Sequence, residues 1–137
     1  MAPEIQTPDW MKNSVIYEVN TRQFNANGTF KSFAPEIPRI KNLGVDVLWF
    51  MPIYPIGKLN RKGGLGSYYS IKNYHEVNPE FGTLADFKAV VNQAHAQGLK
   101  VILDWVPNHT AWDSNLVSEH PDWYIKDWQG NFRPTAW

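Results

Sequence analysis

The stretch most suggestive of chemistry runs from Leu103 to His109 and reads LDWVPNH. An apolar run ends in Asp104, and Asn108 and His109 follow within five residues. A carboxylate and an amide oxygen can accept hydrogen bonds or ligate a hard cation, and an imidazole can bind a substrate or move a proton. Singly, each has a structural interpretation as a cap, a turn former or a packed side chain. Together at the end of a strand, they favour a functional site.

The segment that follows is rich in aromatic residues. Aromatic side chains make up 15% of the chain, and those near its end are Trp105, Trp112, Trp123, Tyr124, Trp128, Phe132 and Trp137. Flat rings among polar groups suit the weakly apolar faces of sugar rings, and they suit the packing of a long loop equally well. The aromatic content alone therefore leaves both interpretations open.

The elements that would position these residues alternate between strands and helices. Residues 14–24, 45–53 and 99–106 are apolar or β-branched runs typical of strands. Residues 32–43 and the segment that Thr83 caps carry apolar residues at helical spacing, the latter at Leu84, Phe87, Val90, Val91 and Ala94. Pro38 predicts that the first helix starts late or is kinked. Residues 54–82 are expected to form a long loop.

This order of elements predicts an α/β fold with a parallel sheet, since the strands are too apolar to face water on either side. The doubly wound sheet usually carries a glycine pattern directly after its first strand. That position here reads NTRQFNANGT and lacks it. The long loops instead follow the second and third strands, where barrel enzymes place their active sites. The sequence thus favours a TIM-type (β/α)8 barrel.

Several motifs in the same order carry a family resemblance. DWVPNH resembles the first conserved region of the α-amylase family of glycoside hydrolases. WMKNSVIYEVNTRQF resembles the family's first strand and LGVDVLWFMPIYP its second, while residues 66–110 resemble the part from the second loop through the third strand. The resemblance runs from about Trp10 to the end of the chain. It implies an enzyme that acts on α-glucans, such as starch or maltooligosaccharides, by a retaining mechanism.

The resemblance also implies roles for particular residues. His109 matches a histidine that hydrogen-bonds the sugar at the cleavage site, and Tyr69 matches a tyrosine that stacks on that sugar. Asp104 matches an aspartate that supports the site by holding an arginine further along the chain. Asn108 matches a calcium ligand of the calcium-dependent members, which makes Ca²⁺ a possible cofactor. Asn73 departs from the family pattern, because many members carry Asp there, and a neutral amide does not supply the charge of that Asp.

The catalytic carboxylates are expected outside this chain. The resemblance places them on the fourth, fifth and seventh strands, and none of the 13 acidic residues matches them. Glu18 and Asp104 are strand acids without that role. A barrel takes about 250 residues, so residues 1–137 are expected to be a partial barrel of about three βα units. Residues 110–137 would start the insertion after the third strand. We expect the chain alone to be inactive, and to need the rest of the barrel or to self-associate.

Composition excludes other partners and leaves one alternative. The 13 basic and 13 acidic residues balance, so neither a nucleic acid nor an anionic membrane is an expected partner. No apolar run reaches the roughly 18 residues of a spanning helix. No signal peptide is visible, so the expected location is cytoplasmic unless a leader has been removed. The alternative function is a non-catalytic carbohydrate-binding or interaction module, which the aromatic C-terminal third would serve.

Overall fold

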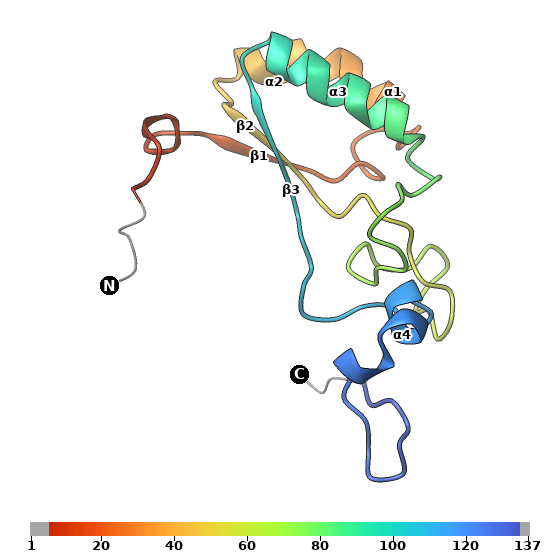
Figure 1. The fold of residues 1–137 in the computed structure, drawn as a ribbon. Helices are drawn as coiled ribbons and strands as arrows, with labels where there is room; N and C mark the ends of the chain where they lie inside the picture. Colours follow the sequence, from red (N-terminus) through yellow and green to blue (C-terminus); the bar gives the residue numbers. More distant parts are fainter. Residues whose placement is uncertain (1–5, 135–137) are drawn as a thin grey trace.

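The sheet consists of three short parallel strands in sequence order. The computed structural model describes residues 6–134 and pairs β1 (Ile16–Val19) with β2 (Val47–Phe50), and β2 with β3 (Lys100–Leu103). The order β1-β2-β3 differs from the doubly wound order 2-1-3-4-5, but it is shared by a barrel and by the classic doubly wound order 3-2-1-4-5-6. Because the strands are parallel, their carboxyl ends meet at one edge of the sheet. The loops at that edge are the long ones (Figure 1).

All three strands are shorter than the sequence predicts. The first was expected over residues 14–24, but the chain turns directly after Val19, where the backbone N–H of Gln23 donates to the carbonyl of Asn20 at 3.1 Å. The other two end in the same way at the start of a loop. Asp104 therefore lies one residue beyond β3, and the backbone N–H of Asp104 still donates to the carbonyl of Phe50 at 2.9 Å. The sequence predicted Asp104 inside the third strand near its end, and the structure places it directly after that end.

The helical segment between β1 and β2 is interrupted at its two prolines. It comprises α1 (Phe30–Phe33), a 3-10 turn η2 (Ala34–Glu36) and α2 (Ile37–Asn42). Pro35 and Pro38 each lie in the first positions of a new turn, where a missing N–H costs least. The prediction of a kink is confirmed, but the helical turns begin at Phe30, two residues before the predicted segment 32–43. The N-cap is Thr29, which forms a capping box with Ser32.

The helix before β3 matches its prediction closely. α3 (Leu84–Ala96) is capped by Thr83, whose hydroxyl accepts from the Asp86 backbone while the Asp86 carboxylate accepts from the Thr83 backbone. Phe87, Val90 and Ala94 are buried as expected, but Leu84 is exposed. Leu84 is the first residue of α3, so its side chain lies beyond the part of the helix that covers the sheet.

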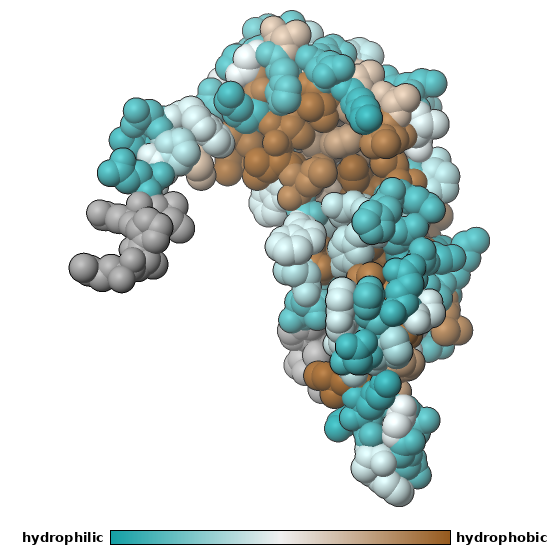
Figure 2. Space-filling model, viewed as in Figure 1, coloured by the Kyte–Doolittle hydropathy of each residue, from teal (hydrophilic) through white to brown (hydrophobic). Residues whose placement is uncertain are grey.

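The core lies between the helices and one face of the sheet. Phe50 of β2 packs edge-on against Phe33 and Phe87, with ring centroids 5.3 and 5.4 Å apart. Figure 1 shows α1, α2 and α3 together on the same side of the strands. The opposite face of the sheet carries Ile16, which is 55% exposed, and Ile102, which is 40% exposed. Apolar residues gather visibly over the strands in Figure 2.

The chain after β3 leaves the sheet and forms small elements of its own. These are α4 (Asn115–Glu119), the 3-10 turn η3 (Pro121–Trp123) and a loop closed by an isolated bridge between Lys126 and Phe132. A further 3-10 turn, η1 (Asp9–Met11), precedes β1. Within residues 6–134, no helix has the length and apolar character needed to cross a bilayer. Trp137, one of the aromatic residues noted in the sequence, lies outside the described residues.

Candidate functional site

The candidate site lies at the carboxyl edge of the sheet and is built by two loops. We call residues 51–83, between β2 and α3, the first rim loop, and residues 104–114, between β3 and α4, the second rim loop. Tyr69 belongs to the first and Asp104, Asn108 and His109 to the second. The structure thus brings all four predicted site residues to the same edge.

Tyr69 and Asp104 are joined by a hydrogen bond that the sequence did not predict. The Tyr69 hydroxyl donates to Oδ2 of Asp104 over 2.9 Å. The residues lie 35 positions apart, and each is only partly exposed. The carboxylate therefore holds the far end of the phenol ring. A ring fixed at this end presents its faces in a defined orientation.

Burial and negative charge make Tyr69 hard to ionise. Desolvation is the largest cause that raises the pKa of Tyr69 to about 12, followed by the hydrogen bond to Asp104 and the charges of Asp104 and Glu18. The folded protein binds the phenol proton more tightly than the unfolded chain, where the pKa is 10.0. This contribution to stability is therefore fully present below pH 10 and is lost as the pH rises toward 12.

Replacing Asp104 by Asn is expected to lower the pKa of Tyr69 without returning it to 10.0. The substitution removes the negative charge and weakens the hydrogen bond, but the burial that contributes most to the shift remains. The check is a titration of the tyrosine ring carbons by NMR in wild type, Asp104→Asn and Tyr69→Phe, the last to assign the signal. An unchanged Tyr69 pKa in Asp104→Asn would show that the two side chains are not coupled.

Asn108 and His109 form a second polar pair beside Tyr69. The side-chain nitrogen of Asn108 lies 3.1 Å from Nδ1 of His109. In the tautomer where Asn108 donates to Nδ1, the proton of His109 is on Nε2, which can then donate to a ligand. The Tyr74 hydroxyl donates to the backbone carbonyls of Val106 and His109, at 2.5 and 3.3 Å. Tyr74 thereby fixes the backbone on which the pair is carried.

Tyr69, Asn108 and His109 line one pocket of about 960 Å³. Its other walls include aromatic side chains from the segment after β3, namely Trp105, Trp112, Trp123, Tyr124 and Phe132. Asn73 also lines the pocket, and its side-chain oxygen accepts from the backbone N–H of His75 at 3.0 Å. The volume is in the range of small-molecule sites, and many polar and charged side chains line the pocket together with the rings.

The two rim loops are tied together along a seam centred on Ile71, which is completely buried. Ile71 forms an antiparallel bridge with Ile56, and the carbonyl of Ile71 accepts from the backbone N–H of Ala111 at 2.9 Å. On one side of this seam the Asp113 carboxylate accepts from the backbone N–H of Lys58 at 2.9 Å. A Cβ at Gly57 would lie 2.2 Å from the Cβ of Ala111, so only glycine permits this approach.

The residues described do not by themselves make a calcium site. Calcium takes six to eight oxygen ligands, and Asn108 supplies one. Because its amide nitrogen faces His109, its oxygen is the atom that would face a cation. Among residues 6–134 there is no group of three or more His, Cys, Asp or Glu side chains placed to hold a metal ion.

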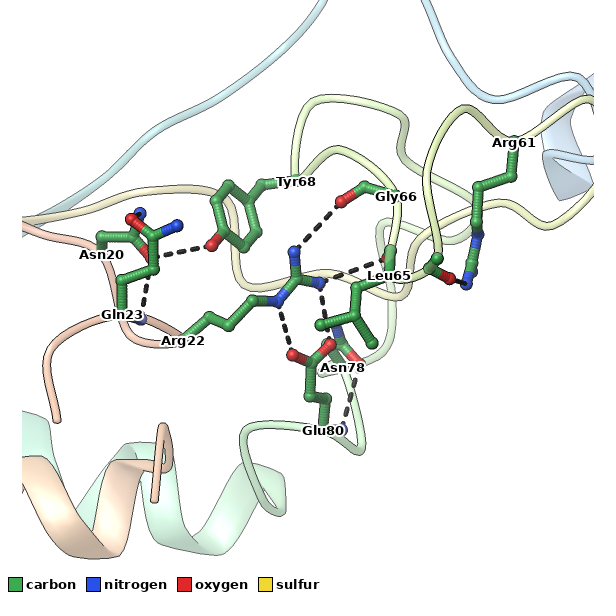
Figure 3. A network of polar contacts seen from close by, with 10 residues as sticks. Asn20, Arg22, Gln23, Arg61, Leu65, Gly66, Tyr68, Asn78 and Glu80 are labelled. Atoms are coloured by element: carbon green, nitrogen blue, oxygen red, sulfur yellow. Dashed lines mark hydrogen bonds and ion pairs between the residues drawn. The ribbon is translucent and has the colours of Figure 1, made fainter. Parts of the chain in front are cut away.

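Sequence reasoning missed the residues that hold the rim loops in place. They include Tyr74, Asp113 and a network around Arg22 and Glu80, which lie 58 positions apart (Figure 3). Arg22 lies in the segment WMKNSVIYEVNTRQF that resembles the family's first strand, but the sequence assigned it no role. The only available signal was its position directly beyond a strand, at the edge where the site lies.

Comparison with known proteins agrees with this architecture. A solved alpha-amylase from Lactobacillus plantarum superposes with a TM-score of 0.90 at 49% identity, over 93% of this chain and 30% of that one. A noncanonic maltogenic alpha-amylase from Thermotoga neapolitana gives a TM-score of 0.85 at 40% identity, over 89% of this chain and 30% of that one. The trehalose-6-phosphate hydrolase of Bacillus subtilis is 31% identical over 96% of this chain and 27% of its own length.

This chain therefore spans less than a third of the length of these relatives. The three strands correspond to the N-terminal part of their TIM barrels. The family model for the alpha amylase catalytic domain matches residues 9–137, and the chain belongs to the α-amylase family of glycoside hydrolases.

Proposed function

We propose that residues 1–137 supply part of the sugar-binding site of a retaining enzyme that cleaves α-glucans such as starch or maltooligosaccharides. The observation that supports this most directly is the shared pocket of Tyr69 and His109 at the carboxyl edge of the sheet. In barrel enzymes this edge carries the active site. The relatives named above are amylases and a glucoside hydrolase, which is consistent with a glucan or glucoside as substrate.

In this proposal Tyr69 binds the sugar through its ring. The phenol is held by Asp104, so one ring face can lie against the apolar face of a glucose unit. His109 donates a hydrogen bond to a hydroxyl of the same sugar. Asp104 also pairs with an arginine from another part of the full-length protein, and Asn108 contributes an oxygen to calcium where calcium is bound.

The reaction needs two carboxylates, and in this proposal neither of them comes from residues 1–137. A retaining glycosidase uses a nucleophile and an acid about 5–5.5 Å apart. Glu18 and Asp104 stand at strand ends, but Asp104 is engaged in holding Tyr69. We propose that the reacting acids come from later strands, and that Tyr69 and His109 orient the sugar toward them.

The ring of Tyr69 is tested by two substitutions in the full-length protein. Tyr69→Ala removes the platform and is expected to raise the Kd for a maltooligosaccharide about tenfold or more, which corresponds to about 1.4 kcal/mol. Tyr69→Phe keeps the ring but loses the hydrogen bond to Asp104, so its effect should be smaller. Isothermal titration with a maltooligosaccharide analogue that the enzyme does not hydrolyse measures both. If Tyr69→Phe raises the Kd as much as Tyr69→Ala does, sugar binding depends on the Tyr69 hydroxyl and not on its ring.

A non-catalytic carbohydrate-binding module is the second candidate. The exposed indoles of Trp105, Trp123 and Trp128 favour it, since a module needs accessible rings and no acids. Turnover distinguishes the two functions. A full-length protein that binds maltooligosaccharides saturably, with a change in Trp fluorescence, but cleaves no α-glucoside would be such a module. Cleavage of starch, maltooligosaccharides or cyclodextrin would establish the enzyme.

A further inference from the structure

The network around Arg22 joins the end of β1 to the first rim loop. Its guanidinium contacts a carboxylate, two backbone carbonyls and a ring, all from residues 65–80 (Figure 3). Only 15% of the Arg22 side chain is exposed, against 32% for Glu80. A partly buried cation with this many partners is costly to disturb, because each lost partner leaves part of its charge uncompensated.

Glu80 is the charged partner, and it is itself held in place. Nε and Nη2 of Arg22 donate to the two oxygens of Glu80 over 2.5 and 2.8 Å, as a bidentate pair. The backbone N–H of Glu80 donates to the side-chain oxygen of Asn78 at 3.0 Å. The backbone N–H of Asn78 in turn donates to the carbonyl of Ile53, just beyond β2, at 2.7 Å. The acid is therefore anchored to the start of the first rim loop, and the arginine is anchored to the acid.

The remaining donors of Arg22 hold the segment that leads to Tyr69. Nη1 donates to the carbonyl of Gly66 at 3.0 Å and Nη2 to the carbonyl of Leu65 at 3.3 Å. The guanidinium carbon lies 4.4 Å from the centre of the Tyr68 ring, and the Tyr68 hydroxyl donates to Asn20 at 2.8 Å. Residues 65, 66 and 68 are thus fixed to the chain that follows β1.

Gly66 is also held from its other side. It has φ +73°, and a Cβ there would lie 2.8 Å from Cγ2 of Ile56 and 3.0 Å from Nε of Arg61. A tight turn then covers the three residues to Tyr69. The backbone N–H of Tyr69 donates to the hydroxyl of Ser67 at 3.2 Å, and the backbone N–H of Ser70 donates to the carbonyl of Ser67 at 3.0 Å. A shift of Gly66 is therefore passed directly to Tyr69.

We propose that Arg22 is a positioning residue for substrate binding, which acts by holding Leu65, Gly66 and Tyr68 so that the ring of Tyr69 stays at its place on Asp104. This inference rests on the proposed role of Tyr69 as the sugar platform. In this proposal the forked shape of the guanidinium is the property that matters, since four of its N–H groups donate to four different oxygen atoms. A lysine would keep the charge beside Glu80 and lose the fork.

A double-mutant cycle between Arg22 and Tyr69 tests the proposal in the full-length protein. Arg22→Gln is expected to lower kcat/KM for a maltooligosaccharide about 10- to 100-fold, with the same division between kcat and KM as Tyr69→Ala. In the Tyr69→Ala background, Arg22→Gln should lower kcat/KM by less than about threefold further, because the residue through which Arg22 acts is absent. Arg39→Gln is the matched control, since Arg39 pairs with Glu36 on the surface of α2. It should change kcat/KM less than twofold in both backgrounds.

Arg22→Lys keeps the positive charge but removes the forked guanidinium, so it tests whether the fork is needed. It also replaces Arg22→Gln in the experiment if that variant does not fold. The Arg22→Lys protein should fold, and it should still show most of the loss in kcat/KM that is expected of Arg22→Gln. A second readout is the titration of Tyr69, whose pKa should fall in Arg22→Lys because its bond to Asp104 loosens. Multiplicative losses in both backgrounds, or an Arg22→Lys protein with wild-type activity and Tyr69 pKa, would overturn the proposal. An unimpaired Tyr69→Ala protein would instead refute the role of Tyr69 in substrate binding.

Discussion

Replacing His109 with alanine in the full-length protein is expected to lower kcat by about 10²- to 10³-fold, which corresponds to about 2.7–4 kcal/mol of transition-state stabilisation. His109 lies on the wall of the pocket, beside Asn108 and over a backbone held by Tyr74. A hydrogen-bond donor fixed in this way needs little reorganisation energy when charge develops on the sugar in the transition state. The same substitution should lower the melting temperature only slightly, because His109 is partly exposed and lies outside the phenylalanine core.

The measurement is steady-state turnover of a maltooligosaccharide together with a thermal melt of each variant. His95→Ala is the matched control, since His95 is exposed in the last turn of α3, at the end of that helix away from the first rim loop. It should leave kcat unchanged. Turnover of His109→Ala equal to wild type would show that the histidine does not contact the reacting sugar. A large loss of stability would show instead that the side chain is mainly structural.

A polypeptide of these 137 residues alone is expected to lack glycosidase activity and to self-associate. Within residues 6–134, β1 and β3 each pair on one side only, and the face of the sheet opposite the helices shows Ile16 and Ile102 to water. Unpaired strand edges beside an apolar face favour association between chains. Sedimentation velocity of the purified polypeptide over a range of concentrations, with a thermal melt, measures the effect. Maltooligosaccharide hydrolysis by the same sample should be undetectable.

Charge on the open face provides the control for this second prediction. Ile102→Lys places an ammonium on that face and should reduce association at a given concentration. Leu43→Lys is the matched change, because Leu43 is also an exposed apolar residue but follows α2 on the helical side. It should leave the association unchanged. A clean monomer with a cooperative melt would contradict the prediction and would favour the carbohydrate-binding module.

Local signals predicted the elements of the fold well. The capping box of Thr83 and Asp86 and the apolar stripe of α3 are contained in 14 consecutive residues, so they are legible in the sequence. The strand lengths were overestimated because β propensity continues past Val19, whereas the end of β1 is set by a turn that begins at Asn20. Propensity describes what a segment can form, and tertiary contacts decide where it stops.

The residues of the site were found through family resemblance, and their mutual contacts were not. Tyr69 and Asp104 were each assigned a role, but their hydrogen bond joins positions 35 residues apart and leaves no periodic trace in the sequence. The same holds for Arg22 and Glu80 at a separation of 58. Such pairs depend on how two loops fold back over the ends of adjacent strands, which a single sequence does not encode in any local pattern.

The seam at Ile71 divides the molecule into two regions that open at different free energies. The core under the helices is held by interlocked phenylalanine rings, whereas the seam has a few aliphatic side chains and a set of backbone hydrogen bonds around Ile56, Ile71 and Ala111. Local opening requires less free energy where fewer buried apolar contacts are broken. Amide protons along the seam should therefore exchange with solvent before those of β2. On heating, the pocket would come apart while the sheet and its helices remain folded, so that loss of sugar binding precedes loss of the fold.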